Sequence, residues 1–188
     1  MTTIETRRRQ EGLVFLALFA LTIPAANWLI GHVGTVCQPA GTCLIPVAPG
    51  LMAPSGVIMA GAALVLRDLV QRRLGVAASS LAILVGAVLS ALLAPPALVI
   101  ASAAAFLLSE FADLAVYTPL ARRGLIIAVV ASGVVGLVVD SVVFLWLAFG
   151  SLEFLLGQIV GKAWMVLFSI PCVGWLRRRD ARLGIATV

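Results

Sequence analysis

Six ionisable side chains lie inside otherwise apolar runs of the sequence. They are Arg67, Asp68, Glu110, Asp113, Asp140 and Lys162. A charged side chain at the centre of a bilayer is costly unless it is paired or hydrated, and such residues typically mark a substrate or ion pathway. These six side chains are therefore the first candidates for chemistry.

The rise of a helix predicts that these charges form two layers. Asp140 and Lys162 fall roughly 25 and 22 Å from the nearest basic cluster along their helices, so a carboxylate and an ammonium can pair there. The other four fall lower and combine one cation, Arg67, with three carboxylates. Two of these, Glu110 and Asp113, lie one turn apart on one helical face, where they repel each other unless they share a proton or a cation.

Simpler interpretations accompany some of these residues. Arg67 and Asp68 are near enough to the interface to snorkel. Asp140 and Lys162 also fit a purely structural buried pair. Asn27, in the first apolar run, is a milder signal of a site, and an interhelical hydrogen bond explains it equally well.

The elements that must hold these residues are predicted to be membrane helices. The chain has 188 residues, of which 62% are hydrophobic and 11% charged, and its mean hydropathy is +1.16. A soluble domain carries about a quarter charged residues, so lipid must solvate most of this chain. Residues 81–93 and 125–139 lack the alternation of barrel strands. The sequence therefore predicts an all-α polytopic membrane protein.

A single transmembrane domain is expected over residues 1–188, as a bundle of six membrane-spanning helices. The spans are predicted at about 13–33, 53–70, 76–94, 97–120, 125–149 and 152–176, with an outer loop at 34–52. A basic cluster at 7–9 precedes the first predicted span, and clusters at 72–73, 122–123 and 177–182 follow the second, fourth and sixth. Short loops rich in Lys and Arg stay in the cytoplasm. Both termini are therefore expected in the cytoplasm, with the chain in a bacterial inner membrane.

Charge, cysteine and motif content bound the function. The net charge is +5, and most of the basic residues lie in short clusters between or beyond the apolar runs. This placement indicates membrane topology, so a nucleic-acid partner is not expected. With one His, no Gly-rich phosphate loop and no Ser/His/Asp set, neither a metal, a cofactor nor an enzyme activity is predicted. Cys37 and Cys43 share the outer loop, where a small disulfide and two free thiols are equal alternatives.

Five short motifs, in order along the chain, resemble the queuosine precursor transporters, a group within the vitamin uptake transporter (VUT) family. They are residues 67–75, 109–117, 132–141 followed by Phe144 and Ala148-Phe149, Lys162 followed by Pro171, and Asn27 before Trp28-Leu29. Residues 132–141, which end in Asp140-Ser141, are the most specific of the five. The resemblance covers residues 13–176.

The resemblance implies import of 7-deazaguanine bases, the cyano and aminomethyl precursors of queuosine. A carboxylate can accept the adjacent N–H groups of such a base, an ammonium suits its carbonyl, and an aromatic ring suits its flat face. The expected substrate-binding residues are Asp140, Lys162, Glu110, Asn27, Trp164 and Phe106. The expected coupling or gate residues are Asp113, Arg67 and Asp68.

Two other functions stay open at this point. Six small helices also suit a vitamin-type substrate-binding subunit of an energy-coupling importer, which would need partner ATPases. A non-transport membrane scaffold with a structural charge network is the other. The expected partners are a small purine-like molecule and the lipid bilayer, and a homo-oligomer is left open.

Overall fold

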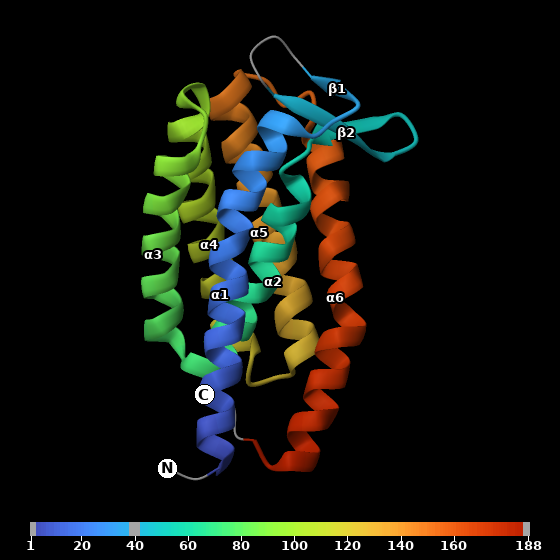
Figure 1. The fold of residues 1–188 in the computed structure, drawn as a ribbon. Helices are drawn as coiled ribbons and strands as arrows, with labels where there is room; N and C mark the ends of the chain where they lie inside the picture. Colours follow the sequence, from blue (N-terminus) through green and yellow to red (C-terminus); the bar gives the residue numbers. More distant parts are fainter. Residues whose placement is uncertain (1–2, 38–41, 186–188) are drawn as a thin grey trace.

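The computed structural model describes residues 3–37 and 42–185, which form a helical bundle closed at one end by a small sheet (Figure 1). The helices are α1 (Thr3–His32), α2 (Val57–Leu74), α3 (Val76–Leu93), α4 (Val99–Leu120), α5 (Leu125–Phe149) and α6 (Leu155–Leu183). The strands are β1 (Val36–Cys37), β2 (Cys43–Ala48) and β3 (Leu51–Pro54), and a short 3-10 turn, η1 (Pro96–Leu98), precedes α4. The start of α1 and the end of α6 lie at the end of the bundle opposite the sheet.

Five of these helices, α1 and α3 to α6, are long and apolar enough to cross a membrane. The prediction of a helical, multi-pass membrane protein is therefore confirmed. α2 is not among the five, since its 18 residues include four charges at positions 67, 68, 72 and 73.

α2 is the central element of the bundle. It packs against all five other helices and contributes to both apolar clusters of the core. Leu64 packs with Leu137 and Val166 in one cluster, and Val70 packs with Phe19 in the other. Because its neighbours cover it, α2 can carry charges that a lipid-facing helix cannot.

Residues 34–52, predicted as an outer loop, contain β-strands in the part that the structure describes. β1, β2 and β3 form an antiparallel sheet in which Val36 pairs with Leu44 and Leu44 with Pro54. Apolar residues flank Pro49-Gly50, and Gly50 has a φ of +74°, which suits the turn between β2 and β3. Residues 38–41 of the predicted loop lie outside the described residues.

A disulfide joins Cys37 of β1 to Cys43 of β2. The two cysteines are also partners in the register of the sheet. The cross-link therefore fastens the short edge strand β1 to the central strand β2.

Several helix ends differ from the predicted spans. α1 begins at Thr3 and α6 ends at Leu183, beyond the expected limits at 13 and 176, because charged side chains can continue a helix after the apolar run has ended. α2 begins only at Val57, and residues 53 and 54, expected in the second span, belong to β3. Hydropathy reports the apolar part of a helix and not its full length.

Two glycines allow helices to approach closely near the charged residues. A Cβ built on Gly61 of α2 would lie 2.9 Å from the Cα of Lys162 on α6. A Cβ built on Gly136 of α5 would lie 2.6 Å from Leu64 Cδ2 and 3.1 Å from Asp113 Cβ. Both contacts are shorter than real side chains allow, so these positions fix the spacing of the helices that carry the charges.

Gly61→Ala is expected to lower the thermal unfolding temperature of the purified protein in detergent. Alanine favours a helix by about 1 kcal/mol over glycine, but overpacking against the α6 backbone typically costs about 1–3 kcal/mol. The matched control is Gly31→Ala, where a Cβ would meet nothing within 4 Å and the unfolding temperature should stay level or rise. Equal shifts in the two variants would contradict the close approach of α2 and α6.

Candidate functional site

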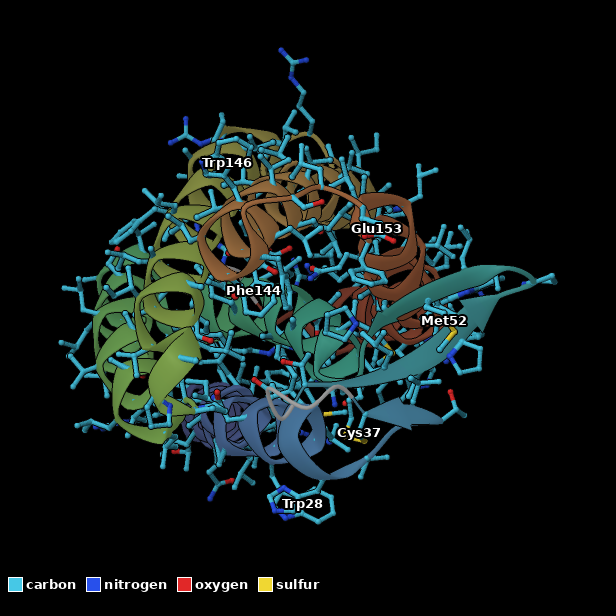
Figure 2. All side chains as sticks on the ribbon, turned by 90° about the horizontal axis from the view of Figure 1, so that it is seen from above. Trp28, Cys37, Met52, Phe144, Trp146 and Glu153 are labelled. Carbon is cyan, nitrogen blue, oxygen red and sulfur yellow. A yellow bond between two sulfur atoms is a disulfide. The ribbon has the colours of Figure 1, made fainter. Side chains whose placement is uncertain are left out.

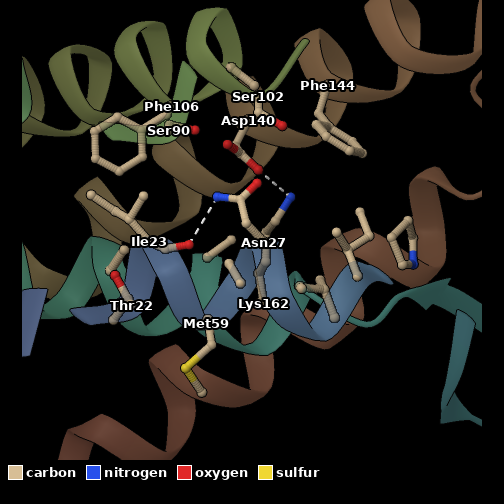
Figure 3. A pocket seen from close by; sticks show the side chains of 18 of the residues that line it. Thr22, Ile23, Asn27, Met59, Ser90, Ser102, Phe106, Asp140, Phe144 and Lys162 are labelled. Atoms are coloured by element: carbon tan, nitrogen blue, oxygen red, sulfur yellow. Dashed lines mark hydrogen bonds and ion pairs between the residues drawn. The ribbon is translucent and has the colours of Figure 1, made fainter. Parts of the chain in front are cut away.

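A cavity of about 90 Å³ lies between the helices in the half of the bundle next to the sheet (Figure 3). Its polar lining comprises Thr22, Asn27, Ser90, Ser102, Asp140, Gln158 and Lys162, and its larger apolar residues are Ile23, Ile30, Val57, Met59, Phe106 and Phe144. A cavity of roughly 10–15 Å³ already admits one water. The chamber is therefore large enough to be wet.

An ion pair between Asp140 and Lys162 forms the charged wall of this cavity. Lys162 Nζ lies 2.6 Å from Asp140 Oδ2, and it also donates to Ser141 Oγ at 2.8 Å and to Gln158 Oε1. An ammonium has three donors, and all three are used here. The predicted pairing of Asp140 with Lys162 at one depth is confirmed.

The two partners of this pair differ in their access to the cavity. The side chain of Lys162 is 1% exposed, whereas that of Asp140 is 17% exposed. The second carboxylate oxygen of Asp140 receives only a long hydrogen bond, 3.4 Å, from Ser109 Oγ. Asp140 points toward Asn27, whose amide donates to the Ile23 carbonyl at 2.9 Å (Figure 3). Asp140 therefore keeps acceptor capacity for a ligand.

Aromatic side chains border the cavity, although not all of those expected. Phe106 and Phe144 line it, and Phe144 points into the bundle when the molecule is seen from the sheet end (Figure 2). Trp164, contrary to expectation, is not among the lining residues. It lies on the outer face of α6, stacked on Phe168, and its Nε1 donates to the Val47 carbonyl of β2 at 3.1 Å.

The inner charge cluster consists of Arg67, Asp68, Glu110 and Asp113. The Arg67 guanidinium lies 2.7 Å from Asp68 Oδ1, 2.9 Å from Asp113 Oδ2 and 3.4 Å from Glu110 Oε2. Asp68 also accepts a hydrogen bond of 3.1 Å from Ser132 Oγ of α5. The predicted grouping of one cation with three carboxylates is confirmed.

Surrounding side chains hold the Arg67 guanidinium in place. Arg67 donates to Gln71 Oε1 at 2.9 Å, and Gln71 Nε2 donates to Thr118 Oγ1 at 3.0 Å. The Tyr117 ring lies 5.5 Å from the guanidinium carbon. Since the Arg67 and Asp68 side chains are at most 1% exposed, they do not snorkel to the membrane surface.

Glu110, expected among the substrate-binding residues, lies with the inner charge cluster and is not one of the residues that line the cavity. The preceding residue, Ser109, links the two layers. Its hydroxyl reaches Asp140 at 3.4 Å and the Phe106 carbonyl at 3.1 Å. The cavity and the inner charge cluster are thus neighbouring parts of one polar interior.

A third ionic layer was not anticipated from the sequence. Asp180 of α6 accepts from Arg73 at 2.8 and 3.0 Å and from Arg72 at 2.9 Å. Glu11 of α1 pairs with Arg73 at 3.0 Å and with Arg179 at 2.6 Å. This terminal ion-pair network ties α1, α2 and α6 together at the end opposite the sheet. The sequence did not predict these ion pairs, because a pair of arginines at a helix end has the same sequence pattern whether it marks membrane topology or makes internal salt bridges.

Residues 91–176 match the family model described as "Putative vitamin uptake transporter". The match covers somewhat less than half of the 188 residues, and over that part the chain is similar to this family. The matched region includes α4, α5 and most of α6, and with them Glu110, Asp113, Asp140 and Lys162. Comparisons with curated proteins and with solved structures found no match. The similarity to a family of membrane transporters agrees with the five helices that are long and apolar enough to cross a membrane.

Neutralising one member of the Asp140–Lys162 pair should destabilise the protein more than neutralising both. Lys162→Met leaves Asp140 without its cation, and Asp140→Asn leaves a buried ammonium with only neutral acceptors. A double-mutant cycle from detergent-induced unfolding should give a favourable coupling of about 1–3 kcal/mol. The matched control is Glu153→Gln, at an exposed carboxylate next to α6, which should change little. Additive single effects would show that the pair is not energetically coupled.

Proposed function

We propose that this protein is a membrane transporter that imports a queuosine precursor, 7-cyano- or 7-aminomethyl-7-deazaguanine, across a bacterial inner membrane by alternating access. The observation that carries the proposal is the Asp140–Lys162 pair in the wall of a small internal cavity. A guanine-like base presents N–H donors on one edge and a carbonyl nearby. A carboxylate beside an ammonium is the matching set of acceptor and donor.

The rest of the cavity also suits a flat, polar-edged base. Ligand sites are mostly apolar with a few placed polar groups, and here Phe106 and Phe144 supply the apolar faces. Asn27 faces Asp140 across the cavity (Figure 3) and can contact a further edge of the base. An aminomethyl substituent adds a cation, which the nearby carboxylates attract.

The small size of the cavity favours a small substrate and requires the helices to move when the substrate enters. Its volume of about 90 Å³ is well below the roughly 300 Å³ at which pockets for drug-sized ligands begin. A bicyclic base would therefore enter only when the helices part. That requirement fits a carrier that opens to each side in turn.

The proposed topology has six spans with both termini in the cytoplasm. α2 is the sixth span, shielded from lipid by the five apolar helices. The basic clusters fall at the start of α1, at the α2–α3 and α4–α5 junctions and at the end of α6, whereas the connections at the sheet end, residues 33–56, 94–98 and 150–154, contain no Lys or Arg. This asymmetry supports a cytoplasmic position for the basic end.

In this orientation the terminal ion-pair network is the cytoplasmic gate. The cavity lies near the sheet end, and the inner charge cluster and then the terminal ion-pair network lie between it and the cytoplasm. Asp113, Arg67 and Asp68 belong to the middle layer, where a coupling role suits them better than a gate. Opening toward the cytoplasm would require Asp180 and Glu11 to release the arginines of α2.

The family description favours a vitamin as the second candidate cargo. A chain that serves as the binding subunit of an energy-coupling importer would bind its vitamin but would not transport it alone. Purified protein in lipid vesicles separates the two functions. Uptake of a labelled deazaguanine by this chain alone supports the proposal, and vitamin binding without uptake supports the alternative.

Cells that cannot synthesise queuosine precursors should accumulate labelled precursor when they express this chain alone. Asp140→Asn and Lys162→Met should each lower the uptake rate at least tenfold. A charge-assisted hydrogen bond contributes about 1.5–3 kcal/mol, and 1.4 kcal/mol is tenfold. Glu153→Gln is the control, and immunoblots of membranes check insertion. Uptake near the wild-type rate in either site variant would contradict the proposed binding site.

A further inference from the structure

We propose that Glu110 is a proton-binding site that couples transport to the proton gradient. The inference rests on the proposed transport function for its physiological meaning. Its structural basis lies in the inner charge cluster, which neither the family description nor the cavity explains.

The first step is the charge imbalance of the cluster. One guanidinium, that of Arg67, lies within 3.4 Å of three carboxylates, and all four side chains are at most 2% exposed. A single positive charge balances one carboxylate and leaves two. An unbalanced carboxylate buried in a low dielectric takes up a proton instead of staying ionised.

The contacts then indicate which carboxyl group carries a proton. Asp68 has the shortest contact with Arg67, 2.7 Å, and a hydrogen bond from Ser132. Asp113 follows at 2.9 Å, and Glu110 is held most weakly at 3.4 Å. Among the described residues, Glu110 Oε2 receives no hydrogen bond, and neither do Asp68 Oδ1 and the two carboxylate oxygens of Asp113. The distance to the guanidinium therefore distinguishes the three carboxylates, and Arg67 stabilises the ionised form least at Glu110, where a proton is retained most readily.

The position of Arg67 favours a proton over a metal cation. The guanidinium contacts oxygens of all three carboxylates. A sodium ion would compete for these same oxygens and would be repelled by the guanidinium at short range. A proton needs only one oxygen and no coordination shell.

Glu110 is also placed to sense the cavity. It follows Ser109, whose hydroxyl reaches Asp140 at 3.4 Å, so the charge on Glu110 changes the electrostatic potential at the cavity. A proton on Glu110 removes its repulsion of the Asp140 carboxylate. Proton binding and substrate binding therefore affect each other, and this coupling is reciprocal.

The remaining charges around Glu110 are few. They are Arg67 and Asp68 from α2, Asp113 from α4, Asp140 from α5 with its partner Lys162 from α6, and Tyr117 beside Arg67. α3, which packs on α4, has no charged residue, and residues 12–31 of α1 have none. Neither α3 nor residues 12–31 of α1 therefore supplies a positive charge that could neutralise Glu110 in place of a proton.

The test uses purified full-length protein in lipid vesicles, with labelled 7-aminomethyl-7-deazaguanine as the probe. An inwardly directed proton gradient should stimulate uptake by the wild-type protein. Glu110→Gln, which mimics the protonated carboxyl, should lose this stimulation entirely while retaining exchange of external for internal substrate. Glu153→Gln should behave as wild type in both assays.

Infrared spectroscopy supplies a readout that does not need transport. At neutral pH the wild-type protein should show the C=O stretch of protonated carboxylic acid, and this band should be weaker in Glu110→Gln because the contribution of Glu110 is lost. A wild-type spectrum without the band, or a band of equal intensity in Glu110→Gln, would overturn the proposal even if that variant exchanged substrate poorly. Equal gradient stimulation in Glu110→Gln and wild type would overturn it as well.

The assays separate failure of the two proposals. If the wild-type protein neither takes up nor exchanges deazaguanine, the proposed substrate is wrong, and the infrared band still decides whether Glu110 holds a proton. If the wild-type protein exchanges substrate but its uptake ignores the proton gradient, transport stands and the coupling role of Glu110 fails.

Discussion

Charges inside a membrane bundle must find counter-charges, and in this protein many of them do so on a different helix. Lys162 of α6 pairs with Asp140 of α5, Arg67 of α2 with Asp113 and Glu110 of α4, and Asp180 of α6 with the arginines that end α2. Apolar packing against lipid gives little preference for one helix neighbour over another. The ion pairs therefore specify the order of the helices, with α2 at the centre because three of its cations, Arg67, Arg72 and Arg73, pair with other helices.

The three ionic layers differ in charge balance and in the hydrogen bonds that their side chains receive. These differences suggest a different role for each layer. The terminal ion-pair network has nearly balanced charges and several short hydrogen bonds, as expected of a clamp. The inner charge cluster is buried and holds more carboxylates than cations. The Asp140–Lys162 pair borders a cavity. From the basic end to the sheet, the layers pass from the terminal ion-pair network, through the proposed proton site, to the proposed ligand site.

Sequence reasoning located the charged layers better than their surroundings. The helical rise placed Asp140 and Lys162 at one depth because both lie on uninterrupted helices between clear ends. The same rise does not tell which way a side chain points around the helix. For that reason Trp164 was expected at the substrate, although it faces the outside of α6. Glu110 was assigned to the substrate, although its contacts belong to Arg67.

The remaining errors came from long-range pairing, which spacing along the chain does not encode. The sheet depends on strands that meet across Pro49-Gly50 and across residues 38–41, and its Pro and Gly content resembled a loop. Asp180 and Glu11 lie 169 positions apart in the sequence numbering and share arginine partners at the basic end. Their role became visible only when α1 and α6 were seen side by side with α2.

The central claim is that charged side chains from separate helices converge on a wet cavity that binds a flat base. A structure determined with 7-aminomethyl-7-deazaguanine bound tests this most directly. The account predicts the base between Phe106 and Phe144, with its N–H edge within hydrogen-bond distance of Asp140 and its carbonyl toward Lys162. A bound base at any other place in the bundle, with the Asp140–Lys162 pair undisturbed, would contradict it.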